Sequence, residues 1–382
     1  MGATLTVSGT VYNWPTNVSR INEFGTLIEQ TQTNLLSQSQ ALGTAPWTTV
    51  GIVAAAPTVT NNSTDLFAPD GTTTATKIVY PTVGATGISL VNQPVNVLAS
   101  TNYVMSAYMC TLSGAATGSI FLINGGSLTN YGSPAFNLTN KWQRFSFTST
   151  LGAGDGGAGN HGIGFLPSQL GTGEENPIPN FTVYVWGAQL EKLANSSQLA
   201  TSYIPTAANS LSRGTELVSV TNPLSSSGIL PWGIRVDIQP QSGSAWNDPA
   251  LTRGIIFMSP SFSGSFTTSN SFAFFALAAS SKFELDVYDT GGASTQSTTW
   301  LHSFATGSKH SLALTSNSGS WNLYADGQWM SGTITSAGTG QIAALPSTIA
   351  IGPWDTGGAQ PLQGYYSNLV VAQTIDPGVL FS

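Results

Sequence analysis

The stretch Asn102-Tyr-Val-Met-Ser-Ala-Tyr-Met109 decides the fold class of this chain. Its residues Tyr103, Met105 and Ala107 occupy alternate positions, and side chains two residues apart lie on the same face of a β-strand. The period-two pattern therefore predicts a strand that turns these three side chains toward one face.

Similar short runs, rich in Val, Ile, Thr, Phe and Tyr, recur along the chain between clusters of Gly, Asn, Ser and Pro. They include Thr74–Tyr80, Gln143–Thr148, Phe181–Trp186, Gly233–Ile238, Phe272–Leu277, Phe283–Tyr288, Ser311–Thr315, Trp321–Ala325 and Tyr365–Ala372. The best helical stretch, Thr26–Gln38, is short and rich in Thr and Gln, so we expect a loop or at most a turn or two there. The pattern predicts an all-β fold with two antiparallel β-sandwich (jelly-roll) domains in tandem.

Domain boundaries follow from a polar stretch near the middle of the chain. Residues 207–227 contain Ser, Asn, Arg213, Glu216 and Pro223, and they separate two strand-rich blocks. We therefore expect a lead or attachment segment at 1–30, a first sandwich at 31–206, a linker at 207–227 and a second sandwich at 228–382.

The composition is poor in charge. Of 382 residues, 10 are Lys or Arg and 17 are Asp or Glu, so 7% are charged, against ~25% in typical soluble domains. With a formal net charge of −7, the chain lacks the clustered basic residues that bind phosphates, so nucleic acid is excluded as a partner. The apolar content of 41% is enough for real cores, which argues against disorder.

Targeting signals are not visible in the sequence. No window approaches ~18 consecutive apolar residues, so we expect no membrane insertion. Residues 1–12 lack the basic and apolar regions of a signal peptide, so we expect no Sec export. The single cysteine, Cys110, excludes an internal disulfide, so stability must come from burial and strand pairing.

Five short motifs follow one another along the first block, and their order and spacing are informative. They are Gly25-Thr-Leu-Ile-Glu29 with Thr33-Asn-Leu-Leu36, Ala68-Pro-Asp-Gly-Thr-Thr-Thr-Ala75 with Lys77-Ile78, Trp142-Gln-Arg-Phe145, Val183-Tyr-Val-Trp-Gly-Ala-Gln-Leu-Glu191 and Ala200-Thr-Ser-Tyr-Ile-Pro205. Together, over residues 25–206, they resemble the carbohydrate-binding-module-like jelly roll of bacteriophage virion proteins, including head and tail fibers and spikes. One departure is Gln32, where that family often has a basic residue.

The second block resembles, more loosely, the concanavalin A-like sandwich of laminin-G and related lectin domains, over residues 228–382. The resemblance lies in Ser311-Leu-Ala-Leu314, Trp321-Asn-Leu-Tyr-Ala-Asp-Gly327, Ile349-Ala-Ile-Gly352 and Gly364-Tyr-Tyr-Ser-Asn-Leu-Val-Val-Ala372. Asp326-Gly327 predicts a tight hairpin turn, because Gly accepts a positive φ and Asp caps the turn.

Catalytic motifs are sparse. Three histidines, His161, His302 and His310, show no metal-ligand spacing, and no G-x-S-x-G elbow supports a nucleophilic serine. The stretch Phe283–Asp289 comes close to the E-x-D-x-x-E of family-16 glycoside hydrolases, with Glu284, Asp286 and Asp289 as candidates.

On a regular strand Glu284 and Asp286 share a face, whereas Asp289 points the other way unless a bulge intervenes. Asp289 stands at the position of the general acid, and its side chain is one methylene shorter than the usual glutamate, so it would fall short of the glycosidic oxygen. The stretch therefore favours a solvent-facing edge strand, and a glycan depolymerase stays as the alternative.

Aromatic residues in loops are the better functional signal, because sugar rings stack on flat side chains. The candidates lie among Gly, Ser, Asn and Pro, and they are Trp47, Tyr131, Trp246, Trp300, Trp329 and Trp354. Each could instead plug a sandwich end or a subunit interface. Trp186 and Trp321, within strand motifs, are expected to face inward.

Calcium is the metal that the two resemblances imply, since such sandwiches often hold one through carboxylate and carbonyl oxygens. The candidate ligands are Asp70 and Glu191, with Asp65 and Asp355 as further acids. The alternative for Asp70 is a turn cap before Gly71. No other cofactor is expected.

The resemblance of the first block implies a phage virion protein, and we expect a non-enzymatic head or tail fiber or spike on the virion surface. We expect it to bind host cell-surface polysaccharide, to contact other virion proteins and to form a homo-oligomer. A trimer is favoured by resemblance to other fibers. The alternatives are the depolymerase and a purely architectural capsid decoration protein.

Overall fold

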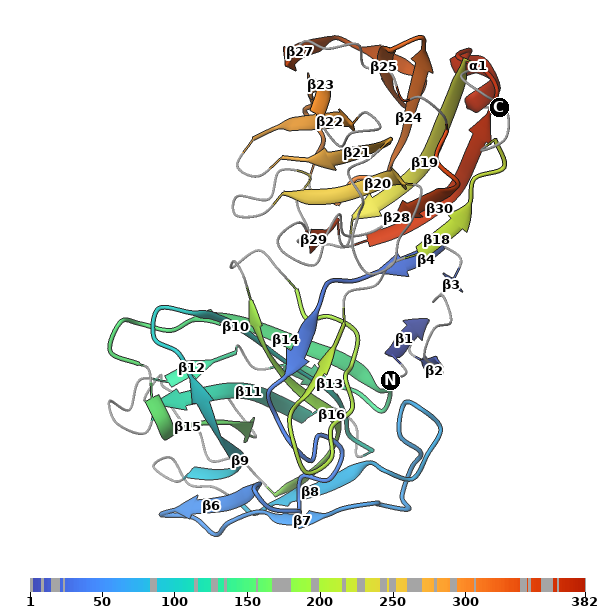
Figure 1. The fold of residues 1–382 in the computed structure, drawn as a ribbon. Coiled ribbons are helices and arrows are strands. Elements are labelled where there is room, and N and C mark those ends of the chain that lie inside the picture. Colours follow the sequence, from blue (N-terminus) through green and yellow to red (C-terminus); the bar gives the residue numbers. More distant parts are fainter. Residues whose placement is uncertain are drawn as a thin grey trace. The chain divides into compact units, whose positions relative to one another are not determined.

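The computed structural model contains two compact units, each built almost wholly of β-strands (Figure 1). It describes residues 3–7, 10–14, 21–22, 25–82, 88–112, 116–124, 130–133, 136–155, 157–166, 180–193, 199–214, 218–224, 231–240, 246, 252–259, 270–277, 280–288, 294–305, 307–336, 342, 345–351, 360–362 and 364–381. The predicted all-β sandwich architecture is confirmed, and the described residues include one helical turn, α1 (Pro377–Leu380).

The first unit is a sandwich of two antiparallel sheets. Among the described residues, one sheet has the order β14 (Gln143–Thr150), β10 (Asn102–Cys110), β16 (Phe181–Leu193), β8 (Thr76–Tyr80) and β7 (Thr58–Thr60). The other has the order β12 (Asn130–Gly132), β11 (Ala116–Asn124), β15 (Gly157–Leu166), β9 (Ile88–Val97) and β6 (Thr48–Ile52), with β13 (Phe136–Leu138) beside β11. Two short pairs complete it: β1 (Ala3–Val7) with β2 (Thr10–Trp14), and β5 (Gln32–Asn34) with β17 (Leu211–Arg213).

The core of the first unit lies between these two sheets. Tyr103, Met105 and Ala107 of β10 all enter it, as the period-two pattern predicted. They pack in one cluster with Val91 of β9 and Phe165 of β15. Burying such side chains contributes about 1.5–3 kcal/mol for each large one, so this face of β10 contributes strongly to the stability of the unit.

The second unit is also a sandwich. Among its described strands, one sheet has the order β18 (Val218–Thr221), β28 (Thr348–Ile351), β20 (Arg253–Ser259), β21 (Ser271–Ala276), β22 (Lys282–Tyr288), β23 (Ser294–Leu301) and β27 (Gly332–Ser336), with β29 (Gln360–Pro361) beside β20. The other has the order β26 (Gln328–Met330), β25 (Ser320–Ala325), β24 (His310–Asn317), β19 (Trp232–Pro240), β30 (Gly364–Ala372), β4 (Gly25–Ile28) and β3 (Ile21–Asn22). We call these the β20 sheet and the β24 sheet.

The second unit includes a segment from the start of the chain. Residues 19–31 belong to it, because β4 pairs with β30 in the register Leu27 opposite Tyr365. Gly25 has φ +123°, and a Cβ at this position would clash with the carbonyl oxygen of Tyr366. The Gly25–Glu29 motif, which the sequence resemblance assigns to the first sandwich, thus contributes a strand to the second (Figure 1, blue β4 beside red-orange β30).

The segment between the two predicted sandwiches is also partly ordered into strands. Leu211–Arg213 pairs with β5 in the first unit, and Val218–Thr221 pairs with β28 in the second. The division between the units falls between Arg213 and Gly214. The polar composition of 207–227 therefore marks the change of unit but not an unpaired stretch.

The Asp326-Gly327 hairpin prediction is confirmed. Asp326 and Gly327 join β25 to β26 with φ values of +50° and +81°, as a two-residue turn between twisted strands requires.

In the described part of the chain, no helix has the length and apolar character needed to cross a membrane.

Candidate functional site

An exposed aromatic pair lies on the β25–β26 hairpin of the second unit. Trp329 is 60% exposed, and it lies directly opposite Tyr324, which is half-buried. Directly opposite residues project from the same face of a sheet, so the two side chains are neighbours on the outer face. We call Trp329, Tyr324 and Asn322 the hairpin platform.

Asn322 restrains the exposed ring. The indole Nε1 of Trp329 donates a hydrogen bond to Asn322 Oδ1 at 3.3 Å. Leu323 and Ala325, which alternate with these residues on β25, are buried in the core and hold the strand in place. A large apolar ring is thereby presented to solvent without being free to collapse onto the surface, at a place where amide groups can bind hydroxyls.

Tyr324 and Asn322 were missed by the sequence analysis, although a signal for them existed. The predicted two-residue turn at Asp326-Gly327 places Ala325 opposite Gln328 and therefore Tyr324 opposite Trp329. Counting back from that turn would have identified the pair.

Three of the predicted sugar-binding tryptophans are core residues instead. Trp47, Trp246 and Trp300 have exposed fractions of 5%, 0% and 1%. The indole of Trp47 donates to the carbonyl oxygens of Ser37 and Gln38, at 3.2 and 3.1 Å. Rings enclosed in this way cannot stack on a sugar, so the prediction is wrong for these three.

The remaining predicted aromatics divide into two groups. Trp186 and Trp321 are buried, as expected from their places in strands. Tyr131 lies in β12 opposite Leu122, but its side chain is outside the described residues, as is the whole of Trp354. Of the six candidates, Trp329 is the one for which the structure describes an exposed ring.

A second site lies on the outer face of the β20 sheet. Glu284 and Asp286 of β22 both point away from the core, because Phe283, Leu285 and Val287 face into it. The prediction that the two acids share a face is therefore confirmed. Asp289, the third acid of the motif, lies outside the described residues.

The two carboxyl groups have different surroundings. Partial burial, together with the nearby Asp286 carboxyl, raises the pKa of Glu284 to about 7. Asp286 accepts hydrogen bonds from Ser297 Oγ at 2.5 Å and from Tyr288 OH at 3.4 Å. Glu284 lies opposite Phe275, which is buried in a small apolar cluster on this same face. Glu284 can therefore hold a proton at neutral pH.

The predicted calcium ligands of the first unit have protein partners. Both carboxylate oxygens of Glu191, which is fully buried, accept hydrogen bonds from Thr201, through its N–H at 2.9 Å and through its Oγ1. Burial raises the pKa of Glu191. Glu191 therefore secures the segment around Thr201 to β16.

The other acids also act locally. Asp70 Oδ1 accepts from the N–H and the Oγ1 of Thr72 at 3.1 and 2.7 Å, which is the turn cap offered as its alternative. Hydrogen bonds from Lys77 and Tyr184, both at 2.7 Å, lower the pKa of Asp65. Asp355 lies outside the described residues. No group of three or more His, Cys, Asp or Glu side chains gathers to hold a metal within the part that the structure describes.

Comparisons with known proteins give only distant likenesses. No protein-family model matches the chain, and no curated protein matches it. Among solved structures, the CBM40 domain of the Ruminococcus gnavus IT-sialidase, bound to α2,3-sialyllactose, is 12% identical with a TM-score of 0.30, covering 40% of this chain and 82% of that one.

Two further solved structures are similar at the same level. Domains LG4-5 of the mouse laminin α1 chain are 11% identical, cover 76% of this chain and 88% of that one, and have a TM-score of 0.29. The enzymatically active domain of tailspike protein 4 from bacteriophage CBA120 is 12% identical, covers 42% of this chain and 21% of that one, and has a TM-score of 0.30. At these values the likenesses define neither a family nor a function for this chain.

Proposed function

We propose that this chain is a virion surface protein that binds host cell-surface glycans through the hairpin platform. The observation that carries the proposal is Trp329, a tryptophan that is 60% exposed and yet hydrogen-bonded in place beside Tyr324. Exposing a ring of this size to water is unfavourable, so a fixed exposed ring favours a ligand that covers it.

A sugar is the ligand that this chemistry fits. The apolar C–H face of a pyranose stacks on an indole, while its hydroxyls exchange hydrogen bonds with amides such as Asn322 and the exposed Gln328. The chain has 7% charged residues, so its surface suits neutral polysaccharide better than a strongly charged polymer.

The viral setting of the proposal rests on the sequence. The motifs of residues 25–206 resemble phage virion jelly rolls, which supports a fiber or spike of the head or tail that contacts other virion proteins. One stacking platform gives weak affinity. We propose a homo-oligomer, because linked platforms raise the avidity by about 10²–10⁴ without new contacts when the geometry permits simultaneous engagement. A trimer is favoured by resemblance to other fibers.

A glycan array tests the binding proposal. We expect the full chain to bind a subset of arrayed oligosaccharides, and Trp329→Ala to lower its affinity for them by about tenfold or more, equivalent to ~1.4 kcal/mol. Leu301→Ala is the matched control, because Leu301 is 70% exposed on the other sheet of the same unit. No array signal, or equal losses in both variants, would contradict the proposal and favour a purely architectural role.

Glycan cleavage is a second candidate function, favoured by the pair Glu284 and Asp286. A glycosidase needs one protonated carboxyl group as its acid, and a pKa of about 7 lets Glu284 carry that proton, with the Asp286 carboxyl close by on the same strand. Against it stands the third acid of the motif, Asp289, which is one methylene shorter than the glutamate usual at that position. We propose binding without glycosidic cleavage as the principal function.

Release of reducing ends from the polysaccharide that the array selects distinguishes the two candidates. If Glu284 is the acid, the wild type releases sugar and Glu284→Gln does not, while Trp329→Ala weakens binding but leaves some release. If the chain only binds, neither protein releases reducing ends and Glu284→Gln keeps the array signal.

A further inference from the structure

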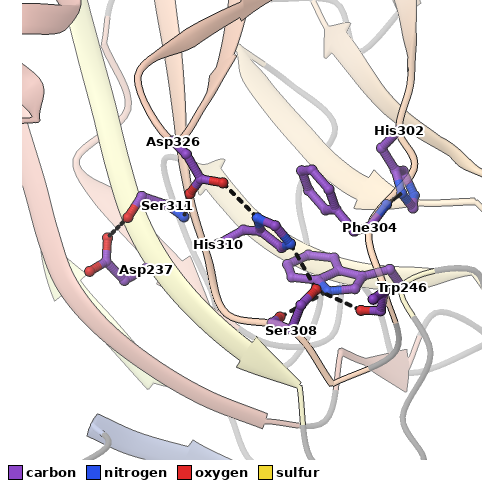
Figure 2. A network of polar contacts seen from close by, with 9 residues as sticks. Asp237, Trp246, His302, Phe304, Ser308, His310, Ser311 and Asp326 are labelled. Atoms are coloured by element: carbon purple, nitrogen blue, oxygen red, sulfur yellow. Dashed lines mark hydrogen bonds and ion pairs between the residues drawn. The ribbon is translucent and has the colours of Figure 1, made fainter.

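A serine, a histidine and an aspartate form a connected chain of hydrogen bonds at one end of the second sandwich. His310 Nε2 lies 2.7 Å from Ser308 Oγ, and His310 Nδ1 lies 2.7 Å from Asp326 Oδ2 (Figure 2). Asp326 follows β25 and His310 begins β24, so the pairing of these two strands brings the residues together. The sequence holds no G-x-S-x-G elbow, the strand–helix motif of many nucleophilic serines, so this cluster has no such local signal.

The hydrogen-bond directions follow from the inventory of donors and acceptors. The Asp326 carboxylate can only accept, so His310 Nδ1 donates to it. The Nε2 of the neutral imidazole is then an acceptor, and it faces the hydroxyl of Ser308. This is the arrangement in which a histidine can remove the proton of a serine.

The base is held rigidly. Asp326 Oδ1 accepts from the N–H of Ser311 at 2.9 Å, which orients the carboxylate. The ring of Phe304 stacks on the His310 ring, with centroids 3.6 Å apart and planes 13° apart. The rings of Trp246 and His310 make an edge-to-face contact, with centroids 5.7 Å apart. The imidazole is therefore fixed in the plane that both of its hydrogen bonds require (Figure 2).

The backbone of Ser308 is hydrogen-bonded to a buried tryptophan, and the residue itself is partly exposed to solvent. Its carbonyl oxygen accepts from Trp246 Nε1 at 3.1 Å, and Trp246 is fully buried. The carbonyl oxygen of Ala305, 2.6 Å from Oγ, competes with His310 for the hydroxyl proton, so we expect slow chemistry.

We propose that Ser308, His310 and Asp326 form a nucleophilic site that transfers acyl groups from small carboxylic esters. Ser308 Oγ attacks the carbonyl carbon while its proton passes to His310 Nε2. The bond between that carbon and the alcohol oxygen then breaks, and His310 returns the proton to the leaving alcohol. Water hydrolyses the acyl-serine by the same route, which yields the carboxylic acid and restores Ser308.

Esters are the substrate class because their alcohols leave more readily than amines do, so less stabilisation of the tetrahedral intermediate is needed. The Ser308–His310–Asp326 cluster and the hairpin platform use different residues, and a simple ester such as p-nitrophenyl acetate needs no bound glycan. O-acylated sugars become substrates only if the platform also binds glycans, so failure of one proposal leaves the other standing.

A fluorophosphonate probe and p-nitrophenyl acetate test the site on the full chain. We expect the probe to label the peptide that contains Ser308, p-nitrophenyl acetate to give a nitrophenol burst, and Ser308→Ala to abolish both. Ser303→Ala is the matched control, because Ser303 is an exposed serine of the same loop.

Asp326→Asn gives the sharper test, because asparagine tolerates the positive φ of this turn. Its amide group would donate to His310 Nδ1, so Nε2 would carry the proton and could no longer accept one from Ser308. We expect labelling to slow by about a hundredfold or more while the thermal melt stays close to that of the wild type. The proposal is overturned if Ser308 stays unlabelled in folded wild type, or if Asp326→Asn is labelled equally fast. The three residues would then only stabilise the hairpin.

Discussion

The buried indole of Trp246 donates a hydrogen bond to the carbonyl oxygen of Ser308, at 3.1 Å. The same ring packs edge-on against Phe283 and Phe304, so a single core residue supports both the apolar core and the loop that carries Ser308. This link makes the position of Ser308 depend on the packing beneath it.

Trp246→Phe should therefore affect both stability and reactivity. The variant keeps an aromatic ring but removes the N–H and some volume, so we expect the second unit to lose about 2–3 kcal/mol of unfolding free energy. Labelling of Ser308 by the fluorophosphonate should slow several-fold. Trp300→Phe removes the same atoms from another buried tryptophan of this core, and it should destabilise without slowing the labelling.

Glu284 should make the stability fall as the pH rises. Its pKa is about 7 in the folded protein and ~4.5 in the unfolded chain, so the folded state binds more protons between these values. The contribution is fully present below pH ~4.5 and is lost as the pH rises through about 7. At pH 8 we expect Glu284→Gln to be about 1–2 kcal/mol more stable than the wild type in urea unfolding, and at pH 4.5 to be similar. A difference that does not change with pH would contradict this assignment.

His302 should have the opposite effect. Burial, with a smaller contribution from nearby His310, lowers the pKa of His302 to about 4, against ~6.5 in the unfolded chain. Between these values the unfolded chain binds more protons, so the unfolding free energy falls as the solution is acidified from pH ~6.5 to ~4.

His302→Phe keeps a ring against Phe283, on which His302 stacks at 4.4 Å, and removes the titration. We expect the wild type to lose about 2–3 kcal/mol more than this variant between pH 7 and pH 4, measured by urea unfolding. Parallel curves for the two proteins would show that His302 does not titrate in this range.

Glu191 should be critical to the first unit. Glu191→Ala leaves the N–H of Thr201 unpaired in a buried place and its hydroxyl with only the long 3.4 Å bond to the carbonyl oxygen of Ser202, so we expect a loss of about 2–4 kcal/mol in thermal or urea unfolding. Glu191→Gln keeps an acceptor and should lose less. Lys192→Ala, an exposed neighbour on the same strand, should change stability by no more than about 0.5 kcal/mol. Equal effects at 191 and 192 would contradict the role given to Glu191.

Asn322 should control how well the platform binds. Asn322→Ala removes the acceptor for the Trp329 indole but leaves the ring itself, so the ring must be ordered by the ligand. On the glycan array we expect a loss of about two- to fivefold, smaller than the loss in Trp329→Ala. A loss as large as that of Trp329→Ala would mean that Asn322 itself makes the main contact with the sugar.

Local features of the fold could be predicted because they depend on neighbouring residues. The alternation of Tyr103, Met105 and Ala107 and the turn at Asp326-Gly327 are both properties of short stretches. The shared face of Glu284 and Asp286 follows from the same period of two.

Features that depend on distant residues were not predictable in this way. Trp246 stands between Ala and Asn in a sequence typical of a loop, and its burial depends on Phe283 and Phe304, which come later in the chain. The link between His310 and Asp326 requires the register of β24 on β25. The pairing of Leu27 with Tyr365 has no local signal at all.

The pairing of β4 with β30 has a consequence for synthesis. A ribosome makes Gly25–Ile28 before the whole of residues 32–213, and it makes the partner strand Gly364–Ala372 only after both. The first unit can fold while translation continues, whereas β4 must wait with its edge unpaired, which is a hazard for association with other nascent chains. The second unit can therefore reach its final form only after synthesis has passed β30.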